Sequence, residues 1–359
     1  MEKRQFRFAS QKNRWGFTIL SIILCIILGP FASALALIPR MMTALPLMLI
    51  ILLGYVGIVS TVVCTAILTA YASMLFGIWG TLGALIFLLP PLIVSAVTSE
   101  RNVAFWKASA VSGLVMLLCE YIVLAIISMV AGQDAVSATM QLFVDFFNEN
   151  KQLTNVLVDG LMQSGLLTSS SAISSISLMT DAERISILQS LIQGMDQVLR
   201  LEVPMQIATG AVSVGLLGQF MIRKSMLRKG EKVDCPAFRT WCIPKGFGRI
   251  MAATVLALYL ISMIGNRNNA MFYVVSGVFE QFLALQGIAA ICYMLHKNGK
   301  TRGWQIASFI IGYFFLNMVV VIVGIIDQAF DFTHRREEIQ KIEEQQKRDA
   351  YNPRAGQDN

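Results

Sequence analysis

The chain has 359 residues, of which 55% are hydrophobic and 14% are charged, and its formal net charge is +7. An ordinary soluble domain carries roughly 25% charged residues, so this composition excludes a water-soluble globular protein. The positive charge does not indicate nucleic-acid binding, because the Lys and Arg residues lie in short segments between apolar runs and not on an aromatic-interleaved face.

Long apolar runs follow one another along most of the chain. About 20 helical residues cross the hydrocarbon core, so most runs have the length of one span and the second is long enough for two or three. Because the runs are apolar all round, they predict helices and not the alternating strands of a β-barrel. We expect an all-α polytopic transmembrane bundle with about eight or nine spans. The runs cover residues 15–38, 44–98, 108–131, 203–222, 250–264, 271–295 and 304–326.

The basic N-terminal segment 1–14 holds five Lys or Arg residues and one Glu. The run behind it contains Gly29-Pro30 and small residues that imitate the A-x-A site of a signal peptide. We favour an uncleaved first span, because the many later spans also hold the chain in the membrane. Positive residues prefer the cytoplasmic side, so we predict a cytoplasmic N-terminus followed by transmembrane helices within 15–131.

An acidic insertion, 132–202, separates the two sets of apolar runs. It carries eight acidic and three basic residues, which places it outside the cytoplasm. Thr180 and Glu183 form a capping-box pattern, and apolar residues then recur at helical spacing. These amphipathic helices either lie on the outer membrane surface or form a lid over the bundle, and both readings stay open. The apolar positions are Met140, Phe143 and Phe147 in an earlier helix, and Ile185, Leu188, Ile192, Met195 and Leu199 in a later one.

The second set of transmembrane helices, 203–326, is interrupted by a strongly basic loop at 223–249. This loop has eight Lys or Arg residues against Glu231 and Asp234, so we predict that it is cytoplasmic. Lys297, Lys300 and Arg302 mark another cytoplasmic turn. The runs between these two loops are therefore expected to form a hairpin.

The charged tail, 327–359, gives conflicting signals. A cytoplasmic N-terminus and an outer insertion require three helices within 44–98 and nine spans in all, which places the tail outside. Its basic residues favour the inside instead. They include Arg335, Arg336, Lys341, Lys347 and Arg348, but many Glu residues leave the tail near neutral, so the conflict stays open.

Charged and amide side chains at membrane depth are the candidate site residues. Glu120 and Glu280 lie near the middle of apolar runs, where a charge facing lipid costs about 2.5 kcal/mol or more. We expect Glu280 to face a polar interior surface with Gln281 or Gln286, either as a binding site or as a structural hydrogen bond. Asn317, in the last run, is a candidate for the same kind of interior contact.

No catalytic constellation is recognisable, so we do not expect an enzyme. The six cysteines are scattered and there are only two histidines, so we expect neither a metal site nor a cofactor. Gly77, Gly80 and Gly83 lie inside an apolar run without a Lys-Ser/Thr pair, which favours helix packing over a phosphate loop.

The C-terminal third carries a recognisable motif: Leu285-Gln286-Gly287 within a run, then Gly324-Ile325-Ile326-Asp327, Phe330-Asp331-Phe332 and Arg335-Arg336. With Pro39, Ala44-Leu45-Pro46-Leu47, Gly54 and Gly57, this resembles the YybS-like family of uncharacterised bacterial membrane proteins. The resemblance implies a multi-pass protein of the bacterial cytoplasmic membrane and names no reaction.

The N-terminal runs, with Ala32 and Ala36, are also distantly similar to the substrate-capture subunits of energy-coupling-factor transporters. This similarity implies a transporter-like subunit that binds a small solute and needs a separate ATPase partner. The alternative is a non-catalytic scaffold of the cell envelope that recruits partner proteins. The lipid bilayer is the partner common to both.

Overall fold

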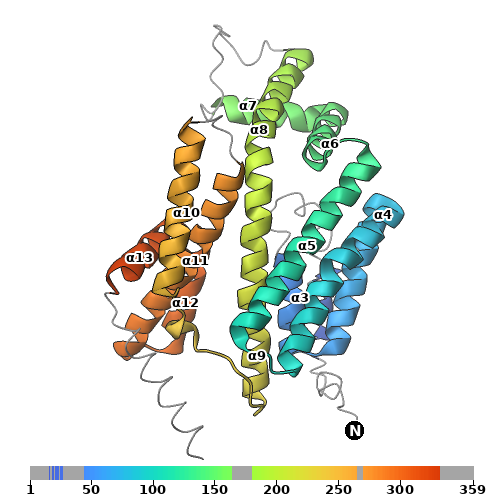
Figure 1. The fold of residues 1–359 in the computed structure, drawn as a ribbon. Coiled ribbons are helices and arrows are strands. Elements are labelled where there is room, and N and C mark those ends of the chain that lie inside the picture. Colours follow the sequence, from blue (N-terminus) through green and yellow to red (C-terminus); the bar gives the residue numbers. More distant parts are fainter. Residues whose placement is uncertain are drawn as a thin grey trace, which may run out of the picture. The chain divides into compact units, whose positions relative to one another are not determined.

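The computed structural model describes residues 44–163, 180–264 and 270–331, together with residues 16, 18–19, 21–23 and 25–26. Within these residues all regular structure is helical, which confirms the predicted all-α class. Figure 1 follows the elements in chain order: α3 (Ala44–Tyr55), α4 (Ile58–Glu100), α5 (Phe105–Ala131), α6 (Ala135–Glu149), α7 (Lys151–Gln163), α8 (Asp181–Ser213), the π segment η2 (Val214–Gly218), α9 (Gln219–Arg228), the 3-10 turn η3 (Phe238–Thr240), α10 (Lys245–Ile264), α11 (Ala270–Lys297), α12 (Arg302–Phe314) and α13 (Asn317–Phe330).

Five helices in the described part of the chain are long and apolar enough to cross a membrane, or six if α12 and α13 together form one span. The predicted first span lies mostly outside the described residues. The chain is therefore a multi-pass membrane protein, with fewer long helices among its described residues than the eight or nine spans expected. The five helices are Phe76–Glu100, Phe105–Ala131, Val198–Arg228, Gly246–Met263 and Ala270–Lys297.

The apolar run 44–98 folds as three helical segments. The first is α3, and α4 is divided at Gly77, whose φ of 60° and ψ of −143° are not helical. Glycine adopts a positive φ without steric cost, so this residue permits the kink. With 12 residues α3 is about 18 Å long, which is shorter than the hydrocarbon core.

The chain forms two compact units. Unit 1 contains Ser95–Gly113 and Ala208–Asn359, together with Met1–Arg7. Unit 2 contains Phe8–Val94 and Leu114–Ile207. The pocket and most of the predicted site residues belong to unit 1, whereas Glu120 and the acidic insertion belong to unit 2.

The acidic insertion forms α6, α7 and the first part of α8. Val158, Leu188 and Ile192 form a buried cluster against Met140 and Val144. The apolar faces of these helices therefore pack on one another. The predicted capping box is present as well, since the Thr180 amide donates to Glu183 Oε2 (2.7 Å) and the Glu183 amide donates to Thr180 Oγ1 (3.3 Å).

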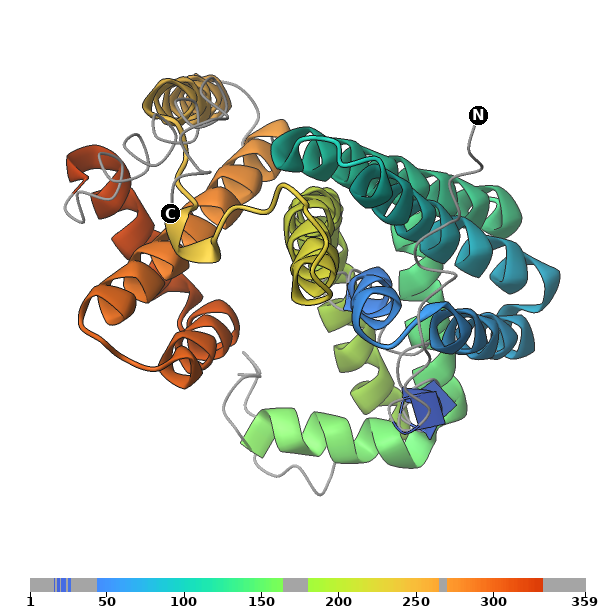
Figure 2. The same cartoon turned by 90° about the horizontal axis from the view of Figure 1, so that it is seen from below.

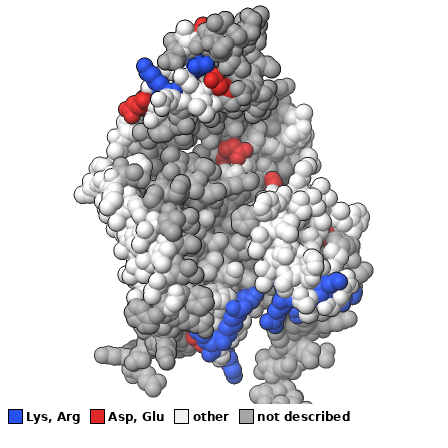
Figure 3. All heavy atoms as spheres, turned by 180° about the vertical axis from the view of Figure 1, so that it is seen from behind, with Lys and Arg blue, Asp and Glu red and all other residues white. Residues whose placement is uncertain are grey.

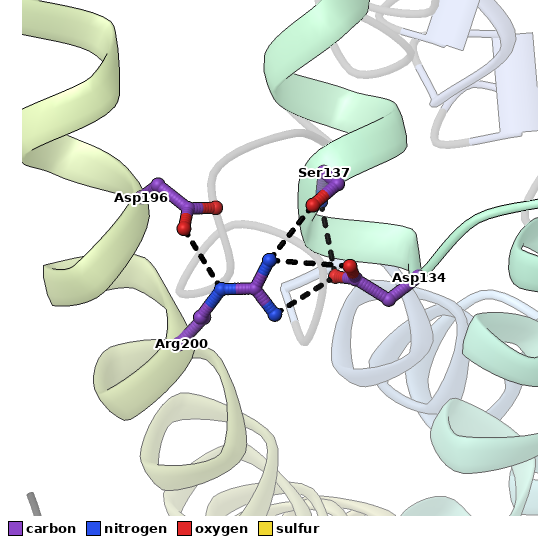
Figure 4. Close-up of polar contacts among 4 residues, drawn as sticks. All are labelled: Asp134, Ser137, Asp196 and Arg200. Carbon is purple, nitrogen blue, oxygen red and sulfur yellow. Dashed lines mark hydrogen bonds and ion pairs between the residues drawn. The ribbon is translucent and has the colours of Figure 1, made fainter.

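A polar network ties α8 to the start of α6 (Figure 4). Arg200 Nη1 and Nη2 donate to the two carboxylate oxygens of Asp134 at 3.2 and 3.1 Å, and Nε donates to Asp196 (2.8 Å). Arg200 Nη2 also donates to Ser137 Oγ (2.7 Å). Hydrogen bonds from Ser137 and the guanidinium of Arg200 lower the pKa of Asp134 to about 2.

The predicted last span, 304–326, is not one continuous helix. It is divided into α12 and α13, whose directions differ by 107°. The turn between them contains Phe315 and Leu316, and both amides donate to the Ile311 carbonyl. Both helices lie beside α11 (Figures 1 and 2).

Candidate functional site

A pocket of about 1220 Å³ lies in unit 1 beneath the segment that joins α9 to α10. We call that segment, residues 229–244, the cover. The start of α5, the π segment, α10 and α11 supply the other walls. The apolar lining includes Phe105, Trp106, Leu216, Phe247, Phe282 and Leu285, and the polar lining includes Asp234, Arg239, Thr240 and Gln286.

Trp241 anchors the cover through aromatic packing. It is 3% exposed, and its ring centroid lies 5.3 Å from that of Phe105 and 5.8 Å from that of Trp106. On the other side it lies 5.4 Å from Phe220 and 5.0 Å from Phe238. Its buried indole N–H has no hydrogen-bond partner among the described residues. The packing therefore fixes the indole at the cost of an unpaired donor.

Arg223 of α9 holds the cover from inside the protein. Its side chain is fully buried, and Nη1 donates to the Asp234 carbonyl (2.7 Å) while Nη2 donates to the Val103 carbonyl (2.6 Å). The Asp234 carboxylate in turn accepts the amide of Phe105, the first residue of α5, at 2.7 Å. A carboxylate at a helix N-terminus accepts a hydrogen bond from an otherwise unpaired amide, and the positive end of the helix dipole stabilises its negative charge. These bonds join α9, the cover and the start of α5.

Gln219, one turn before Arg223, continues this network between helices. Its Nε2 donates to Ser112 Oγ (2.8 Å) and Thr98 Oγ1 (2.9 Å), and its Oε1 accepts Ser99 Oγ (3.1 Å) and Arg223 Nε (3.1 Å). Both polar atoms of the amide are thus paired. A buried polar group with all its partners rigidifies its surroundings.

Sequence reasoning missed this network. Arg223 was counted among the bases of the cytoplasmic loop, but it lies inside α9 and is buried. The available signal was the i, i+4 spacing of Gln219 and Arg223 at the end of an apolar run, which places both side chains on one helix face.

Gln286 lines the pocket, and it connects three elements. Its Nε2 donates to Asp327 Oδ2 of α13 (2.8 Å), and its Oε1 accepts the amide of Ile243 in the cover (2.9 Å). Both Gln286 and Asp327 are buried, at 2% and 0% exposed. Two residues of the predicted family motif therefore meet each other, and Gln286 also contacts the cover.

Two further motif residues, Gly287 and Gly324, mark the place where α11 and α13 pack backbone to backbone. A Cβ on Gly287 would overlap the Val320 carbonyl, and one on Gly324 would overlap the Leu283 carbonyl. Only glycine permits so close an approach. Asp331, with a φ of 48°, ends α13 in the left-handed conformation. Phe332, Arg335 and Arg336, the remaining motif residues, lie outside the described residues.

The other amides expected near Glu280 do not share the pocket. Gln281 Nε2 donates to Ser213 Oγ (2.9 Å) and Tyr313 Oη (3.0 Å). Glu280 is exposed and accepts Asn317 Nδ2 at 3.0 Å. The expected interior position of Glu280 beside Gln281 or Gln286 is therefore not found: Glu280 is exposed and pairs with Asn317, and Gln281 and Gln286 make separate contacts.

Glu120 lies in α5 within unit 2 and is 4% exposed. Neither of its carboxylate oxygens has a hydrogen-bond partner among the described residues. The structural hydrogen bond considered for this residue is therefore not found in that part of the chain. An unpaired buried carboxylate is costly, which distinguishes Glu120 from the other membrane-depth residues.

In the described part of the chain no group of three or more His, Cys, Asp or Glu residues is arranged to hold a metal ion. Cys235 and Cys242 both line the pocket. Burial raises the pKa of the Cys235 thiol to about 11, so this thiol is neutral at physiological pH. The arrangement can bind a ligand by shape, aromatic contact and hydrogen bonding.

Comparison with known proteins gives one match. The model of a family described as a predicted membrane protein (DUF2232) matches residues 18–328. No curated protein and no solved structure matches the chain. The similarities to the YybS-like family and to transporter subunits stay predictions.

Proposed function

We propose that this chain, which belongs to the DUF2232 family of predicted membrane proteins, is a membrane-embedded binding subunit that takes an anionic amphiphilic solute into the pocket under the cover. The pocket itself carries the proposal. Its volume of about 1220 Å³ is in the range of natural ligand sites, which are mostly apolar with a few placed polar groups. Aromatic and aliphatic walls favour an apolar body on the ligand.

Charge around the pocket favours an anionic group on that ligand. Arg239 lines the pocket, and Lys229 and Lys232 belong to the cover. The acidic lining residue, Asp234, already accepts the Phe105 amide. In Figure 3, Lys and Arg side chains gather along the lower edge of the visible surface. A basic rim raises the local concentration of anions.

A transporter-like role fits this reading if another protein supplies energy. The sequence has no phosphate loop, so movement of the solute across the membrane would require a separate ATPase. The basic cover is predicted to face the cytoplasm, where such an ATPase would act. Solute binding alone, without transport, needs no such partner.

Fluorescence quenching by a brominated fatty acid tests the proposal, because bromine quenches tryptophan at short range and the probe is an anionic amphiphile. We expect saturable quenching of the purified protein in nanodiscs, much of it lost in Trp241→Phe. Arg239→Gln should raise the apparent Kd several-fold, whereas Lys300→Gln, which does not line the pocket, should not. Quenching that never saturates and is equal in all variants would mean simple partition into lipid.

An envelope scaffold is a second candidate, favoured by the packing of α6 to α8. Their apolar residues cover one another, which leaves charged surface for a protein partner. Deletion of 132–179 separates the alternatives. A scaffold would lose its co-purifying envelope proteins, whereas the binding subunit would keep its saturable probe site.

A further inference from the structure

We infer that α12 and α13 form a re-entrant hairpin, which enters the membrane on the side of the basic cover and turns back, so that α13 ends on that same side. Neither helix alone crosses a membrane: they have 13 and 14 residues, or roughly 20 Å each. A single broken span would instead carry the chain to the opposite side. Contacts with α11 decide between these paths.

The first helix, α12, runs along α11 and starts at the basic C-terminal end of α11, near Lys297. Near the C-terminus of α11, Cys292 Sγ lies 3.6 Å from the Gln305 carbonyl. About one turn deeper, Ile288 lies beside Gly312. Deeper still, Gln281 donates to Tyr313 near the end of α12. Gln281 is 16 residues from Lys297, which corresponds to about 24 Å along the helix.

The second helix returns toward the basic end. Asn317, the first residue of α13, contacts Glu280, whereas Asp327 near its end contacts Gln286. Between these ends the backbone contacts run the other way, since Val320 meets Gly287 and Gly324 meets Leu283, so α13 crosses α11 steeply within residues 280–287. The two end contacts on α11 are six residues apart, which corresponds to a return of about 9 Å. The 107° bend sets α13 nearly perpendicular to α12, with a small component directed back along α12.

The end of α13 also meets elements that belong to the basic side. The Gln328 side chain lies against Gly248, in the first turn of α10 directly after the cover. Asp327 reaches the cover through Gln286, which accepts the Ile243 amide. A chain leaving on the opposite face would have to end near the other terminus of α10, at Ile264.

This path accounts for the charges of the tail. A re-entrant hairpin does not count as a span, so the chain would continue after Asp331 from the side that the positive-inside rule favours for the six basic residues of the tail. The hairpin also places its tip, Phe315 and Leu316, at membrane depth beside the Glu280–Asn317 contact. Both side chains of this turn are apolar and exposed, and both amides are paired with the Ile311 carbonyl, so these donors stay satisfied.

Cysteine labelling of the full-length chain with an impermeant maleimide tests the inference. Single cysteines would be placed at Lys300, at Asn268 in the turn between α10 and α11, and at Gln357 in the tail. We expect Lys300→Cys and Gln357→Cys to behave alike and Asn268→Cys to behave oppositely. Because the comparison is relative, it holds even if the absolute orientation of the protein is reversed.

A second measurement avoids removal of the native cysteines. Alkaline phosphatase, active only outside the cytoplasm, and a fluorescent protein would each be fused to the tail of the otherwise unchanged chain. We expect a fluorescent and phosphatase-inactive tail. Labelling of Gln357→Cys like Asn268→Cys, or an active phosphatase beside a cytoplasmic Lys300→Cys, would overturn the hairpin without affecting the proposed pocket.

Discussion

Arg223 and Glu120 are both ionisable side chains buried in membrane helices, but they differ in whether their polar atoms have hydrogen-bond partners. Arg223 in unit 1 is fully buried, and each of its three nitrogens donates a hydrogen bond. Glu120 in unit 2 is nearly as buried, yet its oxygens have no partner among the described residues. A paired buried charge organises structure, whereas an unpaired one only costs energy unless it serves another purpose. Burial alone therefore does not identify a functional residue.

Replacement of Arg223 should have the largest effect. Arg223→Leu leaves the Asp234 and Val103 carbonyls without their donor and removes one of the two donors to Gln219 Oε1. Each buried acceptor left unsatisfied costs about 1–3 kcal/mol. Reversible unfolding in detergent and SDS would measure the loss. Arg228→Leu is the matched control on the exposed face of α9 and should cost less than about 1 kcal/mol. Equal losses of stability in the two variants would mean that the buried hydrogen bonds of Arg223 do not stabilise the protein.

A smaller loss is expected from Gly287→Ala at the crossing of α11 and α13. The new methyl group meets the Val320 carbonyl, which is backbone and cannot rotate away, so overpacking should cost about 1–3 kcal/mol or more. Thermal unfolding in nanodiscs would report it. Gly83→Ala serves as the control, because nothing lies within 4 Å of its added Cβ. A neutral Gly287→Ala would mean that the helices are further apart than described.

Glu120 should respond in the opposite direction. Glu120→Leu removes an unpaired polar group and should leave stability unchanged or raise it by about 1 kcal/mol. Glu120→Gln, which keeps the size and the polarity, is the comparison variant. A loss of more than about 2 kcal/mol in Glu120→Leu would indicate a structural partner in the part of the chain that is not described.

The smallest effect concerns pH and the Arg200 network. The pKa of Asp134 is lowered to about 2 in the folded protein. Its contribution to stability is therefore complete above the unfolded value near 3.9 and is lost as the pH falls through about 2. Because Asp134 is largely exposed, the effect should be slight. Hydrogen exchange of α6 between pH 5 and pH 2 would follow it, and Asp134→Asn should remove that pH dependence.

Hydropathy predicted the helical class because a run of apolar residues in lipid must satisfy its own backbone hydrogen bonds, which an α-helix does. The same reasoning did not predict the break within 304–326, where the run contains no proline. The break at Phe315 and Leu316 depends on contacts of α12 and α13 with α11, which are set by tertiary packing. Conversely, Pro204 lies inside α8 without ending it. Local sequence signals thus misplace breaks that neighbouring helices determine.

The candidate site was only partly predictable for a related reason. Gln286 was selected because an amide at membrane depth needs partners, and it does line the pocket. Gln281 and Gln286 have different partners because different helices pack against the two faces of α11. The spacing of residues within α11 does not show which helices these are. The sequence did not indicate that Trp241 or the cover would be buried, since a basic loop is ordinarily solvated. Trp241 is buried only because the cover packs on Phe105 and Phe220.

The π segment Val214–Gly218 limits which deletions the helix from α8 to α9 can tolerate. One π turn holds an additional residue, so every side chain after it is rotated by about 100° relative to an unbroken α-helix. Gln219 and Arg223 directly follow that rotation. Loss of a single codon between 214 and 218 would restore an ideal helix and turn the guanidinium away from Val103 and Asp234. In this stretch, then, the number of residues is constrained as well as their identity, which at Gly215 is set by the close approach of the Ser109 carbonyl.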